Sequence, residues 1–232
     1  YNEAWQEQIE ELDMYFRQAA AYAEVASPGD KNLKFEAMRG AFSGSKRVFI
    51  HADYQKEIQA ALRFIKAHGL NGVIVGGSES WKLGTELLDH DVPVILAPVH
   101  SLPRQAHDPI DLPFKTAAYL DSIGVLYGLS LNGAWEQRNL MFQAGTTVAY
   151  GVPYENAVKS ITSSTAKILG IDDEVGLLEE GKKATLIVST GDALDMMTNN
   201  ISYAFIKGEI IKLPGQQQEL YQRYVEKYGL NE

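Results

Sequence analysis

Four short apolar runs, separated by segments of helical spacing, leave this chain few possible folds. The runs are "RVFI", "GVIV", "VPVIL" and "GVLYG", at 47–50, 72–75, 92–96 and 124–128. Each is of strand length and apolar on both faces, as expected of parallel strands covered by helices. The segments between them, 54–67, 79–88 and 112–122, place their apolar residues on one side of a helix. The pattern predicts a βα repeat with right-handed crossovers, which a barrel and an open doubly wound sheet both require.

Helical and strand-like segments flank this repeat. Before it, Trp5, Ile9, Leu12 and Phe16 form one apolar stripe on a helix that ends near Ala26. After it, the pattern changes to a strand and a hairpin, followed by a helix with Leu220, Tyr224 and Tyr228 in line. The further elements predicted are helices at 33–41, 156–161 and 165–169, a strand at 184–189 and a hairpin at 202–213 that turns at 207–209. The predicted divisions are a helical lead-in at 1–45, the βα region at 46–170, small strands at 171–213 and a helix at 214–232.

Composition excludes several classes of function. The 232 residues carry a net charge of −9, which argues against nucleic acid or an anionic membrane as partner and leaves a small molecule or a cation. The absence of cysteine excludes disulfides and thiolate chemistry, so a metal would need histidine and carboxylate ligands. No apolar run approaches the ~20 residues that span a bilayer, so we expect a soluble protein, cytoplasmic or periplasmic. The sequence opens at Tyr1 with its first methionine at Met14, from which we expect the natural start to be missing.

Sites in parallel βα folds form at the carboxyl ends of the strands. His51 directly follows the first apolar run and is the sharpest candidate, either as a metal ligand or general base or as an ordinary hydrogen-bonded histidine. The "GGSES" turn at 76–80 lacks the spacing of a dinucleotide or phosphate loop, which favours a tight turn. His100 and His107 flank a proline-containing loop that either lines a pocket mouth or is simply solvated.

Two later stretches together resemble one family. "SITSSTAKILGIDDEVGLLEEGKKATLIV" at 160–188 and "AFIKGEII" at 204–211 are similar to the carboxyl-terminal half of the amidohydrolase superfamily, in its imidazolonepropionase-related branch. The resemblance runs from about Arg47 to Lys212. It implies an α/β fold that is the second half, strands five to eight, of a (β/α)8 TIM-type barrel, with added strands of a small β-sandwich. The first half of the barrel and its His-x-His pair are absent from these residues.

The resemblance also implies a chemistry, in which water bound to a divalent metal such as zinc attacks an amide-type carbonyl and an Asp takes the proton. On this alignment His51 is the metal ligand of strand five, the strand-six histidine falls at Gly76, and the strand-eight Asp falls at Asn132. An Asn cannot accept a proton near neutral pH, so Asn132 holds the catalytic position without being a base. Asp53 or Glu79 is the nearest carboxylate that could substitute.

Side chains near these positions are candidates for substrate binding. Trp135 and Arg138 follow Asn132 and offer an aromatic wall and a guanidinium to a carboxylate-bearing ligand, or else they form an ordinary helix start. Glu79 is the third substrate-binding candidate.

Two functions follow from the sequence. One is a divergent amidohydrolase that hydrolyses a carbon–nitrogen bond other than a peptide bond. The other is a catalytically inactive relative that binds a ligand or a partner. Half a barrel leaves open strand edges and an uncovered apolar face, so we expect the missing amino-terminal half or a second copy to cover it.

Overall fold

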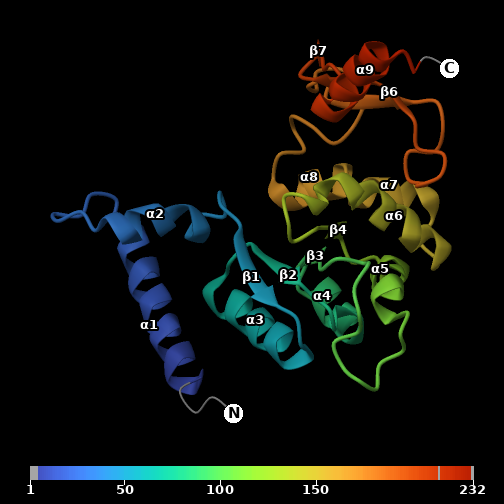
Figure 1. Cartoon of the computed structure of the whole chain (residues 1–232). Helices are drawn as coiled ribbons and strands as arrows, with labels where there is room; N and C mark the ends of the chain where they lie inside the picture. The colour runs from blue at the N-terminus through green and yellow to red at the C-terminus, as the bar shows by residue number, and fades with distance from the viewer. Residues whose placement is uncertain (1–4, 214, 231–232) are drawn as a thin grey trace.

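The chain forms a four-stranded parallel sheet with helices packed on it, followed by a separate three-stranded antiparallel sheet (Figure 1). The computed structural model describes residues 5–213 and 215–230. Within these residues no helix is long and apolar enough to cross a membrane. The elements are α1 (Trp5–Glu24), α2 (Leu33–Phe42), β1 (Val48–Ala52), α3 (Gln55–His68), β2 (Gly72–Gly76), the 3-10 turn η1 (Ser80–Leu83), α4 (Gly84–Asp89), β3 (Val94–Leu96), α5 (Leu112–Ile123), β4 (Tyr127–Leu129), the 3-10 turn η2 (Glu136–Asn139), α6 (Leu140–Ala149), α7 (Tyr154–Ser160), α8 (Ser163–Leu169), β5 (Leu186–Ser189), β6 (Ile201–Ile206), β7 (Glu209–Ile210) and α9 (Gln216–Tyr228).

The parallel sheet has the order β1-β2-β3-β4, so each strand pairs with the next one along the chain. The register places His51 beside Val75, Val75 beside Ile95, and Ile95 beside Gly128. The predicted α/β fold with a parallel sheet is therefore confirmed. In the described part of the chain the sheet is open, because β1 and β4 each have one strand partner.

Two of the strands begin two or three residues later than the apolar pattern predicts. The run at 92–96 becomes a strand only at Val94, because Pro93 lacks the N–H that a ladder position needs. The run at 124–128 becomes a strand at Tyr127, because Gly124 ends α5 in the left-handed conformation with φ 90°.

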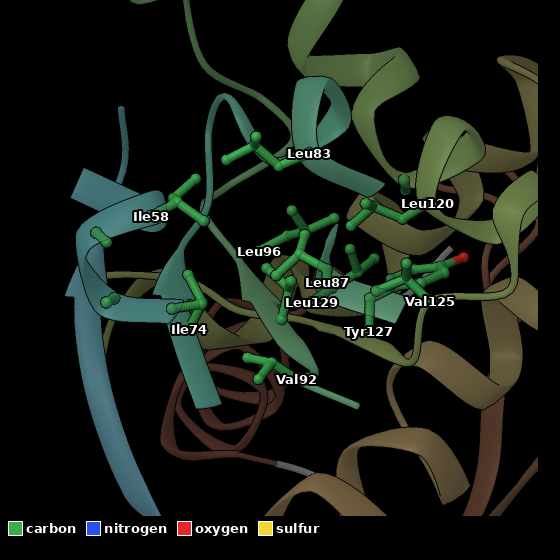
Figure 2. Packing of buried hydrophobic residues seen from close by; sticks show 14 of the residues in the cluster. Ile58, Ile74, Leu83, Leu87, Val92, Leu96, Leu120, Val125, Tyr127 and Leu129 are labelled. Carbon is green, nitrogen blue, oxygen red and sulfur yellow. The ribbon is translucent and has the colours of Figure 1, made fainter. Parts of the chain in front are cut away.

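One face of the parallel sheet carries the hydrophobic core (Figure 2). Ile74 and Leu96 point from this face toward Ile58 of α3 and Leu87 of α4, and all four side chains are buried. Burying one such side chain stabilises the fold by about 1.5–3 kcal/mol, so this layer is the main source of stability for the βα region.

The opposite face is covered unevenly. At its β4 side, a Cβ on Gly128 would lie 2.6 Å from Thr165 Oγ1 and 3.6 Å from Ile168 Cδ1, so α8 packs directly on the strand. At its β1 side, Phe49 is 42% exposed and His51 is exposed beside it. The expected uncovered face is therefore present at β1 and absent at β4.

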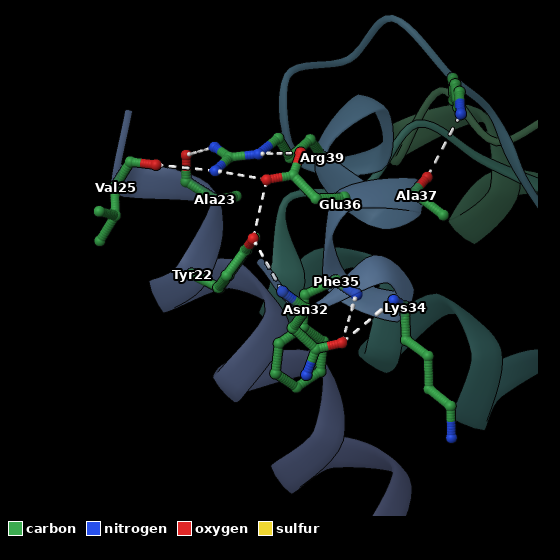
Figure 3. Close-up of polar contacts among 10 residues, drawn as sticks. Tyr22, Ala23, Val25, Asn32, Lys34, Phe35, Glu36, Ala37 and Arg39 are labelled. Carbon is green, nitrogen blue, oxygen red and sulfur yellow. Dashed lines mark hydrogen bonds and ion pairs between the residues drawn. The ribbon is translucent and has the colours of Figure 1, made fainter. Parts of the chain in front are cut away.

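Helices α1 and α2 form a hairpin that one arginine holds together (Figure 3). The guanidinium of Arg39 donates to the carbonyl oxygens of Ala23 and Val25, both at 2.8 Å, and its Nε donates to Glu36 at 2.9 Å. Tyr22 completes the group by donating its hydroxyl to Glu36 at 2.8 Å. These contacts satisfy carbonyls at the end of α1 that have no partner within the helix.

The predicted apolar stripe on α1 is only partly used. Phe16 packs against Phe64 and Phe42, with ring centroids 4.9 and 6.1 Å apart. Trp5, Ile9 and Leu12 are 40–49% exposed. Helical spacing thus predicted the helix but not how much of its apolar face is covered.

The antiparallel sheet has the order β5-β6-β7, and its hairpin turns at Lys207 and Gly208, which have φ of 53° and 86°. This agrees with the predicted turn at 207–209. Helix α9 follows and has no buried residue among those described.

Candidate functional site

Asp53 and Ser78 lie at the carboxyl ends of β1 and β2 and are joined to each other and to Arg104. The Asp53 carboxylate accepts the Ser78 hydroxyl at 2.6 Å through Oδ1 and the Arg104 guanidinium at 2.9 Å through Oδ2. Arg104 Nε also donates to Ser78 Oγ at 3.2 Å. The three side chains form a closed triangle that ties the 97–111 connection across the ends of two strands.

Glu79 is the most buried carboxylate of this edge, at 7% exposure. It accepts a hydrogen bond from Lys82 Nζ at 2.8 Å and from the backbone N–H of Gln55 at 2.7 Å. Burial by itself would raise the pKa of Glu79, but the hydrogen bond and charge of Lys82 and the Gln55 N–H outweigh it and hold that pKa below its usual value. Glu79 is therefore ionised at neutral pH, and both of its oxygens are already engaged.

A narrow pocket opens between the strand ends and the start of α5. Its volume is about 30 Å³, far below the ~300 Å³ at which small-molecule pockets begin, so it admits a carboxylate-sized group and not a whole substrate. Arg104, Ser78 and Glu79 line one side, and Leu112 and Thr116 of α5 line the other. Glu79 is the one predicted substrate-binding residue that this pocket contains.

His51 lies at the end of β1 on the face that the core helices do not cover. It is exposed, and within residues 5–213 and 215–230 its ring makes no hydrogen bond. Both alternatives for His51, a metal ligand or general base and an ordinary histidine, stay predictions.

Asn132, Trp135 and Arg138 lie at the other edge of the sheet, beyond β4. All three side chains are exposed, and the Arg138 guanidinium stacks on the Trp135 ring at 4.6 Å from its centroid. Asn132 follows β4 and His51 lies in β1, so two strands of the sheet stand between them. Their assignment to one site stays a prediction.

The other histidines are engaged elsewhere. His100 Nε2 lies 2.7 Å from Thr146 Oγ1 on α6, and the backbone N–H of His100 donates to Gln143 Oε1 at 2.9 Å. His100 does not line the narrow pocket. His107 is 81% exposed. His68 bonds Asp13 of α1 at 2.9 Å, and its side chain is 5% exposed.

The donor set at the strand ends does not fit a complete metal site. Among the residues that the structure describes, no group of three or more His, Asp or Glu side chains is placed to hold a metal ion. At Gly76, a Cβ would lie 2.8 Å from Asp53 Oδ1, so the strand-six position of the alignment is filled by a neighbouring carboxylate. His51 remains as a single candidate ligand.

Sequence reasoning missed Arg104. A signal exists in the sequence, because Arg104 is the one Lys or Arg in the 97–111 connection and lies between His100 and His107. Sequence spacing could not show that this side chain crosses two strand ends to reach Asp53.

Comparison with known proteins supports the resemblance. The amidohydrolase family model matches residues 115–211, a stretch that begins after His51 and Gly76. No curated protein matches the chain. Among solved structures, an amidohydrolase from Thermotoga maritima MSB8 is 27% identical with a TM-score of 0.76, over 88% of this chain and 55% of that one.

More distant structures share the fold. A prolidase complexed with N-methylphosphonate-L-proline is 21% identical with a TM-score of 0.54, over 81% of this chain and 52% of that one. The ochratoxinase of A. niger is 18% identical with a TM-score of 0.58, over 79% and 45%. The chain spans about half the length of these structures. Together, the family model and the Thermotoga structure support placing the chain in the amidohydrolase superfamily.

Proposed function

We propose that this chain is the carboxyl-terminal half of a (β/α)8 amidohydrolase barrel, and that the assembled protein hydrolyses a carbon–nitrogen bond other than a peptide bond. The family match and the likeness to the Thermotoga amidohydrolase support the hydrolase class. The stretches at 160–188 and 204–211 are the basis for proposing the imidazolonepropionase-related branch within it.

The observation that carries the proposal is the position of His51. It lies near the carboxyl end of β1, is exposed on the face that the core helices leave open, and its ring makes no hydrogen bond in the described residues. Amidohydrolases typically use a divalent metal, which supplies an activated water when it is bound. Because one imidazole is not a metal site, the proposal assigns the remaining ligands to the part of the barrel that this chain does not cover.

Assigning the remaining metal ligands to the other half of the barrel also identifies that half as the partner of this chain. Phe49 beside His51 is 42% exposed, and β1 has a free edge in the described sheet. We propose that the other half of the barrel pairs with this edge and covers this face, and that a small molecule binds between the halves. The alternative is that a second copy of this chain covers the edge and face of β1. Light scattering of this 232-residue chain tests this, because a well-behaved, monodisperse monomer of 25.7 kDa would contradict both.

A catalytically inactive scaffold is the second candidate. Gly76 offers no ligand, and Asn132 cannot accept a proton, so two positions of the aligned site lack the chemistry of the family. This candidate predicts ligand binding without turnover.

Metal analysis separates the two functions. In the natural protein we expect close to one divalent ion per chain, lost in His51→Ala and retained in His107→Ala, a matched control that removes an 81% exposed imidazole. Turnover is then followed with cyclic and linear amides. A protein without bound metal and without turnover would favour the scaffold.

A further inference from the structure

The 97–111 connection carries one guanidinium to the carboxyl ends of β1 and β2. Arg104 reaches Asp53 through Nη2 at 2.9 Å and Ser78 through Nε at 3.2 Å. It also forms part of the wall of the narrow pocket. Its location is therefore set by side chains from two strand ends and not by its own loop alone.

The guanidinium keeps unused donors. Arginine has five N–H groups in a planar fork, and the contacts with Asp53 and Ser78 use two of them. Within the described parts of the chain, Nη1 makes no hydrogen bond. The side chain of Arg104 is 46% exposed, so an acceptor from outside can reach these donors.

Arg104 and Asp53 share one hydrogen bond and do not form a bidentate pair. Only Oδ2 of Asp53 contacts the guanidinium, since Oδ1 is bonded to Ser78. A second carboxylate can therefore pair with the free side of the fork, which is the geometry in which arginine binds carboxylates best. Gly76 makes room for this arrangement, because a Cβ there would lie 2.8 Å from Asp53 Oδ1.

Two other cationic side chains, Lys82 and Arg138, are not placed to bind an anion in this pocket. Lys82 is engaged by Glu79 at 2.8 Å, and Arg138 stacks on Trp135 beyond the opposite edge strand. In a protein with a net charge of −9, attraction of an anion must come from such a local cation.

We propose that Arg104 binds the carboxylate of the substrate, and that the amide hydrolysed is carboxylate-bearing, as in an N-acyl amino acid. That the bound molecule is a substrate rests on the proposed hydrolase function. That Arg104 binds a carboxylate does not depend on it. The pocket of about 30 Å³ takes the carboxylate, and the rest of the molecule lies over the strand ends.

Isothermal titration calorimetry of the natural full-length protein tests this with a set of N-acetyl amino acids of different side chains, each paired with its neutral amide. We expect the acids to bind at least about tenfold more tightly than their amides, and Arg104→Gln to remove that preference. Arg63→Gln on α3 is the matched control, since it removes an exposed guanidinium that makes no ion pair within the described chain. It should leave the preference intact.

Asp53→Asn separates recognition from a structural role. If Arg104 recognises carboxylates, removing its internal competitor should tighten acid binding, while Arg104→Gln weakens it. If the pair only fastens the 97–111 connection, both variants should shift binding in the same direction. That result would overturn the inference, as would loss of preference in Arg138→Gln alone or failure of every acid to bind.

Binding and turnover measured together distinguish the carboxylate-binding proposal from the hydrolase proposal. Acid binding that depends on Arg104 without turnover supports this inference and contradicts the hydrolase. Turnover that is equal for acids and amides, and unchanged in Arg104→Gln, supports the hydrolase and contradicts this inference.

Discussion

The carboxylate of Asp53 fills the space that a side chain at Gly76 would need. A Cβ built on Gly76 would lie 2.8 Å from Asp53 Oδ1, and the backbone there has φ 104°, which L-residues rarely adopt. A side chain at this strand end would therefore have to displace the Asp53 carboxylate that pairs with Arg104. The glycine at position 76, where the family resemblance implies a histidine, is thus accompanied by a carboxylate at the end of β1 that fills the space of the missing side chain.

Gly76→Ala should destabilise the protein by about 2–4 kcal/mol, because it combines an unfavourable φ with a steric clash. Gly124→Ala is the control for the φ term alone, since Gly124 has φ 90° and open space where its Cβ would lie. Urea unfolding of both variants measures the difference. Equal losses would show that the Asp53 carboxylate moves aside without cost.

Glu79→Gln should lower the free energy of unfolding by about 1–3 kcal/mol near pH 7, because Lys82 loses its charged partner at a buried site. The folded state holds the pKa of Glu79 below its usual value. Its contribution is therefore present above the unfolded pKa of about 4.3 and is lost as pH falls through the lower folded pKa. Urea unfolding at neutral and acid pH should show the gap between variant and parent closing in acid.

His68→Ala should loosen α1 from α3. The ring bonds Asp13 at 2.9 Å and lies 5.5 Å from the Phe16 ring, so its removal takes away both a buried hydrogen bond and packing. We expect a loss of about 2–3 kcal/mol and faster proteolysis within α1. Asp13→Asn, which keeps an acceptor for His68, should cost less. A larger loss in Asp13→Asn would contradict this account.

Tyr154→Phe should have an effect that disappears in alkali. Tyr154 donates its hydroxyl to Asp192 at 2.7 Å, and this hydrogen bond, with burial second, raises its pKa to about 12. The stabilisation is present below the ordinary tyrosine pKa of about 10 and is lost as pH rises through about 12. Because Tyr154 is 43% exposed, we expect less than about 1 kcal/mol near neutral pH.

The control for Tyr154→Phe is Tyr203→Phe on β6, whose hydroxyl makes no hydrogen bond within the described residues. Urea midpoints of both variants and the parent, measured from neutral to strongly alkaline pH, provide the comparison. A Tyr154→Phe difference that persists unchanged in strong alkali would contradict the role of Asp192.

Much of the fold could be predicted because local pattern determines it. Apolar runs gave all four parallel strands, and the turn at Lys207 and Gly208 was visible from its residues. What pattern could not give is how far each apolar face is covered. Trp5 and Phe16 share one helical stripe, yet only Phe16 meets aromatic partners, because coverage depends on how α1 lies against α3.

The candidate site was harder to predict, since it depends on side chains reaching across strands. Sequence order places Asn132, Trp135 and Arg138 together, and they do lie together, but away from the pocket that Glu79 lines. Arg104 is 51 residues from Asp53, and only the loop path brings the two into contact. The assignments of His51 and Asn132 stay predictions, because they rest on the resemblance of this sequence to the amidohydrolase superfamily.

The sequential order of the parallel sheet has a consequence for biosynthesis. Since β2 pairs with β1, β3 with β2 and β4 with β3, every new strand meets a partner that has already left the ribosome. Each step closes only a short loop, which keeps the entropic cost of assembly low. The four-stranded sheet and the helices that cover its core face can thus form progressively during translation.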